Sequence, residues 1–199
     1  MRPFAAFVAI ALGLAPAAAG PVRSLAPDDI NGAEFNGGKN SEAVNIKAQV
    51  LLDRARFSPG AIDGRRGENF SNALRAFQEQ SGLKASGELD TPTWEKLTKD
   101  DEPVAIEYTI TDANVKGPFA EDIPEKFEDK AKLKRLDYTG PGQLLAERFH
   151  MDEDLLDRLN AGKKLDQAGT AITVANVNVK PAALDNWTGW EERFRAVSG

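Results

Sequence analysis

The chain has 199 residues, of which 41% are hydrophobic, so it is long enough for one domain of ordinary size or for two small ones. Its formal net charge of −6 excludes a strong attraction to the phosphate backbone of nucleic acids. The absence of cysteine excludes disulfides, thiolate metal sites, a thiol nucleophile and a lipoprotein anchor. We expect two small domains that are held together by packing alone.

Residues 1–19 have the pattern of a secretory signal peptide. Arg2 is basic, the apolar run from Phe4 to Leu14 is too short to span a bilayer, and small residues at Ala17 and Ala19 suit cleavage after Ala19. A buried N-terminal helix is the alternative. The signal peptide therefore predicts export to the periplasm or cell wall, and no later segment has the apolar length of a membrane span.

Residues 20–40 are rich in Gly, Asn, Asp and Pro, which predicts a flexible leader. Residues 41–99 are predicted to form a bundle of three short helices. The first helix is expected over 41–56, and the second over about 70–80 with Asn69 as its cap. Thr91 is expected to cap the third helix, with a proline in its first position. The side chains expected in the core are Leu51, Phe77, Leu83, Trp94 and Leu97.

A change of period marks the second half of the chain. Alternating apolar residues over 104–110 predict a strand within a connector that spans residues 103–133, followed by one short helix near Pro124. Residues 134–178 are predicted to form a strand–helix–helix–strand unit. Its first strand is expected over 133–138, its helices over 143–149 and after the cap Asp152, and its last strand over 170–177. The tail, residues 179–199, is either a short amphipathic helix or loose.

A series of residues between positions 49 and 97 resembles the three-helix peptidoglycan-binding domain. The matching positions are Gln49 to Asp53, Phe57 to Gly60, Asp63, Gly64, Gly67, Ala73, Ala76 to Gln78, Gly82, Leu83, Gly87 and Leu97. Residues 134–177 resemble a divergent LysM module, whose usual first turn is here only Thr139-Gly140-Pro141-Gly142. These resemblances imply a mainly α fold with a small α+β part, made of a three-helix bundle and a βααβ LysM-like module.

The order of these modules is similar to the non-catalytic N-terminal half of bacterial L,D-transpeptidases. That resemblance implies a cysteine nucleophile and a histidine in a catalytic domain after about residue 180, but the chain has no cysteine, and its one histidine is His150. Two alternatives to an independent binding protein stay open. One is a truncated or split relative of the transpeptidases, and the other is a scaffold for a separate cell-wall enzyme.

The loop that precedes the second helix carries the candidate ligand contacts. Peptidoglycan presents stem-peptide carboxylates, amides and N-acetyl sugars, so its receptor needs backbone donors, cations and flat apolar surface. The loop offers a tight turn, two arginines and a helix N-terminus, and the LysM-like resemblance adds two loops that would contact sugar. The predicted ligand-binding residues are Asp63, Gly64, Arg65, Arg66, Gly67, Phe70, Thr139, Gly140 and Asn160.

Each of these assignments has a structural alternative. Arg65 and Arg66 can be solvated charges that pair with Glu68 or Asp63, and Phe70 can be a core residue. A glycan hydrolase with paired carboxylates is the enzymatic alternative, but the densest acidic run, at 152–154, fits the first turn of a helix for dipole reasons alone. We therefore expect a non-catalytic protein with no metal or other cofactor.

Overall fold

The computed structural model describes residues 25–38, 40–119 and 138–177. Within these ranges the fold is mainly helical, with seven helices and a small two-stranded antiparallel sheet, as the sequence predicted. The signal peptide, the helix near Pro124, most of the strand expected over 133–138 and the tail over 179–199 lie outside the described residues. In chain order the elements are α1 (Pro27–Asn31), α2 (Glu42–Arg54), α3 (Glu68–Gln80), α4 (Thr91–Leu97), β1 (Ala105–Thr109), α5 (Asp112–Lys116), α7 (Pro141–Arg148), α8 (Glu153–Leu159) and β2 (Ala171–Ala175).

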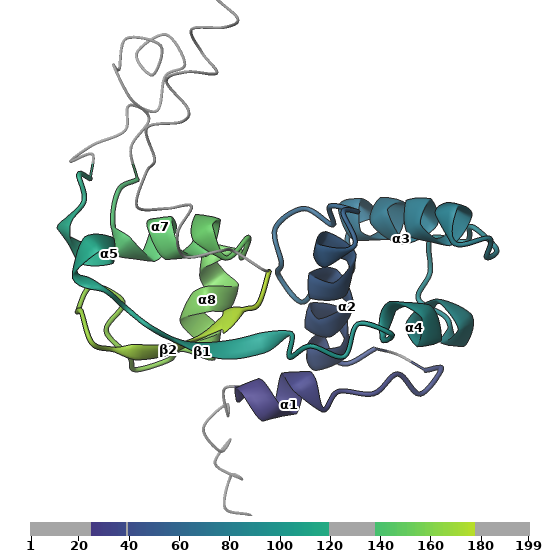
Figure 1. Ribbon diagram of the computed structural model, residues 1–199, viewed down its shortest axis with the longest axis horizontal. Helices are drawn as coiled ribbons and strands as arrows, with labels where there is room; N and C mark the ends of the chain where they lie inside the picture. Colours follow the sequence, from purple (N-terminus) through teal and green to yellow (C-terminus); the bar gives the residue numbers. More distant parts are fainter. Residues whose placement is uncertain (1–24, 39, 120–137, 178–199) are drawn as a thin grey trace, which may run out of the picture.

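The elements form two lobes that lie side by side (Figure 1). Helices α2, α3 and α4 make one lobe, which we call the bundle lobe, and β1, α5, α7, α8 and β2 make the other, the sheet lobe. Their buried apolar side chains belong to a single hydrophobic cluster, which runs from Ile30 to Val177. The two lobes therefore share one core.

The bundle lobe follows the predicted pattern, with corrections at two helix ends. Leu51, Phe77, Trp94 and Leu97 are buried, as expected, whereas Leu83 is only half-buried. The N-cap of α3 is Gly67 rather than Asn69, because the helix starts at Glu68. The N-cap of α4 is Asp90 rather than Thr91: the Asp90 carboxylate accepts a hydrogen bond from the Thr93 amide at 2.9 Å.

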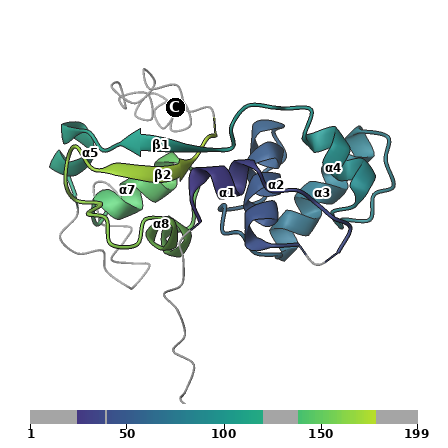
Figure 2. The same cartoon turned by 90° about the horizontal axis from the view of Figure 1, so that it is seen from below.

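Part of the expected leader is folded. Helix α1 contains Ile30, whose side chain is fully buried, and the helix packs against both α2 and β1 (Figure 2). The side chain of Asn31 bonds to the backbone of Val104 and Ala105, and Lys47 of α2 donates to the carbonyl of Asn31 at 2.8 Å. The expectation of a flexible segment therefore does not hold for residues 25–38, because long-range contacts order them.

The strand expected inside the connector is half of the sheet. Strand β1 pairs with β2 in antiparallel register, from Ala105 opposite Ala175 to Thr109 opposite Ala171. Figure 2 shows α7 and α8 against this two-stranded sheet. The ring of Tyr108 on β1 lies 5.0 Å from the ring of Phe149, so aromatic packing joins the sheet to the end of α7. Asp152 caps α8, as predicted, by accepting from the Leu155 amide at 3.3 Å.

Candidate functional site

Buried side chains of α2 brace the predicted binding loop, residues 57–67, and Gln49 makes most of these hydrogen bonds. Gln49 of α2 is 1% exposed, and its amide nitrogen donates to the Asp63 carboxylate at 2.7 Å and to the Arg65 carbonyl at 3.3 Å. Its amide oxygen accepts from the backbone amides of Asp63 and Gly64, at 3.2 and 2.8 Å. The loop therefore has a fixed shape, set mainly by a residue that sequence reasoning noted only as part of the family pattern.

Asp63 and Gly64 build the turn rather than the ligand surface. The Asp63 carboxylate is occupied by Gln49 and by the Arg65 amide, which donates to it at 2.8 Å. Gly64 has φ +73, and an added Cβ would lie 2.8 Å from Cγ of Glu42, so only glycine fits there without a shift. Both residues thus serve the predicted site by orienting the two arginines that come next in the loop.

The two arginines of this loop have different surroundings. Arg66 forms an ion pair with Glu88, and both side chains are well exposed. The side chain of Arg65 is exposed and has no hydrogen bond or ion pair to any residue that the structure describes. Arg65 can bind an anion without first breaking an ion pair, whereas Arg66 would have to leave Glu88. Arg65 is therefore the better candidate contact of the two.

The partner of Arg66 belongs to a second loop with the same construction. Gln78 of α3 is fully buried, and its amide nitrogen donates to the Glu88 carbonyl at 2.9 Å, while its oxygen accepts from the Gly87 amide at 2.9 Å. Gly87, like Gly64, has φ +73. Two loops, each braced by a buried glutamine, are therefore linked on the surface by Arg66 and Glu88.

The remaining predicted residues of the bundle lobe contribute backbone and core. Gly67 caps α3 with φ −123, and an added Cβ would meet nothing within 4 Å, so neither strain nor space demands glycine there. Phe70 is 2% exposed and lies in the core. Its ring therefore presents no surface to a ligand in this conformation.

In the sheet lobe, the predicted sugar-binding residues are divided between surface and core. Thr139 and Gly140 lie at the start of α7, where the Thr139 amide donates to the Gln143 side chain at 2.8 Å. Asn160 is 3% exposed, and its side chain exchanges two hydrogen bonds with the backbone of Thr173 on β2, at 2.7 and 2.8 Å. Asn160 therefore extends the sheet edge, and its amide is not available to an acetyl group.

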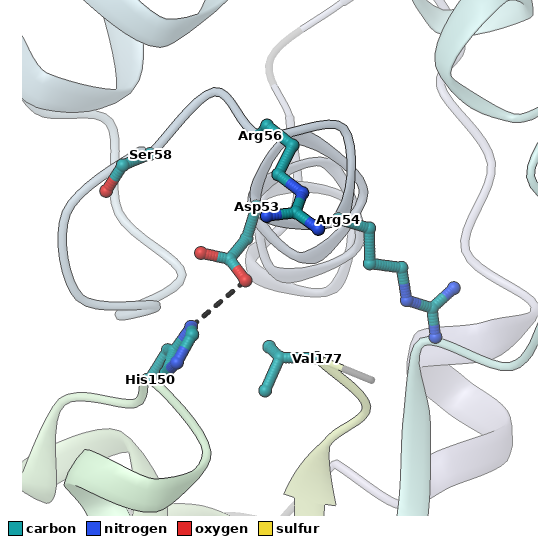
Figure 3. A pocket seen from close by; sticks show the side chains of 6 residues that line it. All are labelled: Asp53, Arg54, Arg56, Ser58, His150 and Val177. Carbon is teal, nitrogen blue, oxygen red and sulfur yellow. Dashed lines mark hydrogen bonds and ion pairs between the residues drawn. The ribbon is translucent and has the colours of Figure 1, made fainter. Parts of the chain in front are cut away.

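A cleft of about 450 Å³ lies between the lobes, and none of the predicted site residues lines it. It is lined by Asp53, Arg54, Arg56, Ser58, His150 and Val177 (Figure 3). Nδ1 of His150 lies 3.0 Å from Oδ2 of Asp53, and this hydrogen bond raises the pKa of His150 against the lowering effect of its partial burial. Sequence reasoning noted His150 only as the one histidine of the chain, because nothing in the local pattern connects it to Asp53.

The cleft brings together a serine, a histidine and an aspartate, the side chains of an acyl-transfer triad. Asp53 and His150 are bonded, but Ser58 has no hydrogen bond to His150 among the described residues, and its hydroxyl instead accepts from the Gly60 amide at 3.4 Å. Without the bond between serine and histidine, the geometry for activating the nucleophile is incomplete.

Two further features concern the described residues alone. No helix within them combines the length and apolarity needed to cross a bilayer. Nor do their His, Asp and Glu side chains gather in any group of three that could hold a metal ion.

Comparisons with known proteins agree with the geometry of the bundle lobe. Residues 45–97 match the protein family described as "Putative peptidoglycan binding domain". This range covers α2, α3 and α4 almost entirely, together with both glutamine-braced loops. Over this range the chain is thus similar to putative peptidoglycan-binding domains.

One curated relative is similar over part of the chain. The carboxy-terminal processing protease CtpB of Bacillus subtilis (strain 168) is 42% identical over 60 residues, which is 30% of this chain. The chain spans only 12% of the length of that relative, so the similarity concerns a small part of that protease.

Proposed function

We propose that the chain is an exported, non-catalytic protein that binds peptidoglycan through its bundle lobe. The observation that carries this proposal is the family match over residues 45–97, which coincides with a compact and internally braced lobe. The predicted signal peptide and its cleavage after Ala19 supply the route to the wall.

The contact that we assign to the ligand is Arg65. Gln49 fixes the backbone on both sides of it, so little backbone entropy is lost when its guanidinium binds. A stem-peptide carboxylate is the matching group, and a charge-assisted hydrogen bond to it contributes about 1.5–3 kcal/mol. Arg66 is already paired with Glu88, so its proposed role is to hold the two loops together.

The sheet lobe is proposed to be a LysM-like module of the same protein. Its two helices against a two-stranded antiparallel sheet support this assignment, and the exposed segment at Thr139 and Gly140 would meet the glycan. Two modules on a polymeric ligand gain avidity, which compensates for a weak affinity of each.

The test is co-sedimentation with purified, insoluble peptidoglycan. We expect Arg65→Ala to lower the affinity at least about tenfold, the equivalent of one lost charged hydrogen bond, with an unchanged thermal midpoint. Lys99→Ala is the matched control, because Lys99 is an exposed cation of the same lobe with no side-chain bond among the described residues. Equal binding by wild type and Arg65→Ala would show that Arg65 is an ordinary surface charge.

The same samples distinguish binding from catalysis. A binding protein leaves the pellet chemically intact, whereas a hydrolase releases soluble fragments of glycan or peptide into the supernatant. Release of such fragments by wild type, and its loss in His150→Gln, would replace this proposal with an enzymatic one centred on the cleft.

A further inference from the structure

Three helices of the structure end with the same pair of backbone hydrogen bonds. At the end of α2 the amides of Arg56 and Phe57 donate to the carbonyls of Asp53 and Leu52, at 3.0 and 2.9 Å. The amides of Gly82 and Leu83 repeat this pattern at the end of α3, and those of His150 and Met151 repeat it at the end of α7. This is the Schellman motif, which requires a left-handed residue just after the C-cap.

Only one of the three ends has the residue that the motif prefers. Gly82 adopts φ +68 without steric cost, whereas Arg56 at φ +69 and His150 at φ +54 hold a Cβ in a region that L-residues disfavour. Among the described residues, these are the non-glycine residues with positive φ. Strained conformations of this kind persist where the surrounding structure enforces them, and they cluster at functional sites.

The two exceptions meet in one place. Arg56 and His150 both line the cleft between the lobes, whereas Gly82 is not among the residues that line it. In Figure 3 the Arg56 side chain comes from the end of α2 and the His150 imidazole from the turn after α7, on opposite sides of the hollow. The position of His150 is fixed by its carbonyl, which accepts from the Ile62 amide at 2.7 Å.

The charges that line the cleft leave Arg56 without a fixed counterion. Arg54 pairs with Asp100 at 3.1 Å and is 3% exposed, and Asp53 bonds to His150. The groups that act on His150 are Asp53 of α2 and Glu147 of α7, and both favour its protonated form. Arg56 is exposed and has no ion pair within the described part of the chain, so its guanidinium is the cation left for a ligand.

We infer that this inter-lobe cleft is a second binding site, which accepts a carboxylate through the Arg56 guanidinium and the His150 imidazole. Ser58 also lines this cleft. A cleft of about 450 Å³ has room for the end of a short peptide. The site is complete only when both lobes are present, because Arg56 and Ser58 belong to the segment after α2 and His150 to the sheet lobe.

The inference rests on the proposed function for the choice of peptide, since stem peptides end in carboxylates. The two can fail separately. The proposed function is measured with insoluble wall material and depends on Arg65, whereas the cleft is measured with a soluble peptide and depends on Arg56. A chain that sediments with the wall but ignores the peptide retains the first and loses the second.

The test uses the single histidine of the chain as a reporter. The proton NMR signals of the imidazole are followed while N-acetyl-D-alanyl-D-alanine is added at constant ionic strength, at about pH 6, where histidine carries substantial positive charge. We expect a saturable shift with the peptide acid and none with its C-terminal amide. The absence of a saturable shift, or an equal shift with the amide, would overturn the inference.

Variants of Arg56 decide whether the side chain acts as a ligand or as part of the fold. Arg56→Gly should lower the affinity for the peptide at least about tenfold, because the guanidinium is lost. It should not lower the thermal midpoint, because glycine suits the left-handed backbone there. Arg56→Lys should retain part of the response. Lys99→Gly, a control that removes an exposed cation outside the cleft, should retain all of it. An unchanged affinity in Arg56→Gly, or a midpoint lowered by the substitution, would contradict the assigned role.

Discussion

Gln49 and Gln78 shape the surface of the bundle lobe from inside it. Both side chains are almost completely buried, and each amide group satisfies the backbone of a loop whose turn contains a left-handed glycine. A glutamine that replaces water for several buried backbone groups cannot be exchanged for an apolar residue of the same volume without leaving those groups unpaired.

We therefore expect Gln49→Ala to lower the free energy of unfolding by about 2–4 kcal/mol, since several hydrogen bonds are lost and buried donors stay unsatisfied. Urea unfolding followed by circular dichroism measures this change. Gln80→Ala is the control, because Gln80 is an exposed glutamine at the end of α3. If both substitutions lowered the free energy of unfolding by the same small amount, the loop would not depend on the buried amide.

The predictability of these residues differed for a physical reason. The turn at Asp63 and Gly64 could be anticipated, because its residue types have strong local preferences. Phe70 and Asn160 were expected to contact ligand directly and are instead buried, since neither residue type reveals from local sequence whether tertiary packing covers it. The left-handed conformations of Arg56 and His150 also lack a sufficient local signal, because positive φ is uncommon for any residue other than glycine.

At the scale of the elements, the strongly periodic helices were predicted well and their ends less so. Helices α2, α3 and α8 lie where their apolar spacing placed them, within a few residues. At α4 two capping residues stand next to each other, and the structure uses Asp90, whose carboxylate accepts from the Thr93 amide, while Thr91 is the first helical residue.

This assignment of the cap makes a measurable difference. Asp90→Ala is expected to lower the free energy of unfolding by about 1 kcal/mol, because the cap bond is lost. Thr91→Ala is the matched control and should change it by less than about 0.5 kcal/mol, since Thr91 is exposed. Thermal unfolding of the two variants side by side checks the prediction. A larger loss of stability in Thr91→Ala than in Asp90→Ala would show that Thr91 is the cap.

The features that the sequence did not reveal, the partner of the correctly predicted strand β1 and the order of α1, depend on distant contacts. Strand β1 pairs with a strand more than sixty positions away, and α1 is ordered by contacts of Asn31 with β1 and α2. Local composition cannot show either contact, because Gly- and Asn-rich residues around a short helix resemble a linker. The fold class was therefore predictable, whereas the joining of the two lobes was not.

In the whole molecule, Arg54 is the main polar link between the lobes. It donates to the Asp100 carboxylate and to the carbonyls of Glu102, Pro103 and Asn176, so one guanidinium ties α2 to the ends of both strands. A second link is the short parallel bridge between Ile62 and Met151. An ion pair between Glu42 and Arg158, at 2.7 Å, adds a third near the surface.

Loss of the buried arginine should loosen the whole molecule. Arg54→Ala is expected to lower the free energy of unfolding by about 3 kcal/mol or more, because Asp100 and three carbonyls lose their donor. Arg75→Ala, which removes an exposed arginine bonded to Asn72, should change it by less than about 0.5 kcal/mol. Denaturant unfolding compares them, and a loss below about 1 kcal/mol in Arg54→Ala would mean that the lobes do not rely on this link.

The central claim is that this two-lobed protein binds the bacterial wall without cutting it. Its most direct measurement is the fraction of the chain that pellets with increasing amounts of purified, insoluble peptidoglycan at low ionic strength. We predict saturable pelleting, with no soluble wall fragments released. A chain that stays in the supernatant at every amount of peptidoglycan, while circular dichroism shows it to be folded, would contradict the account.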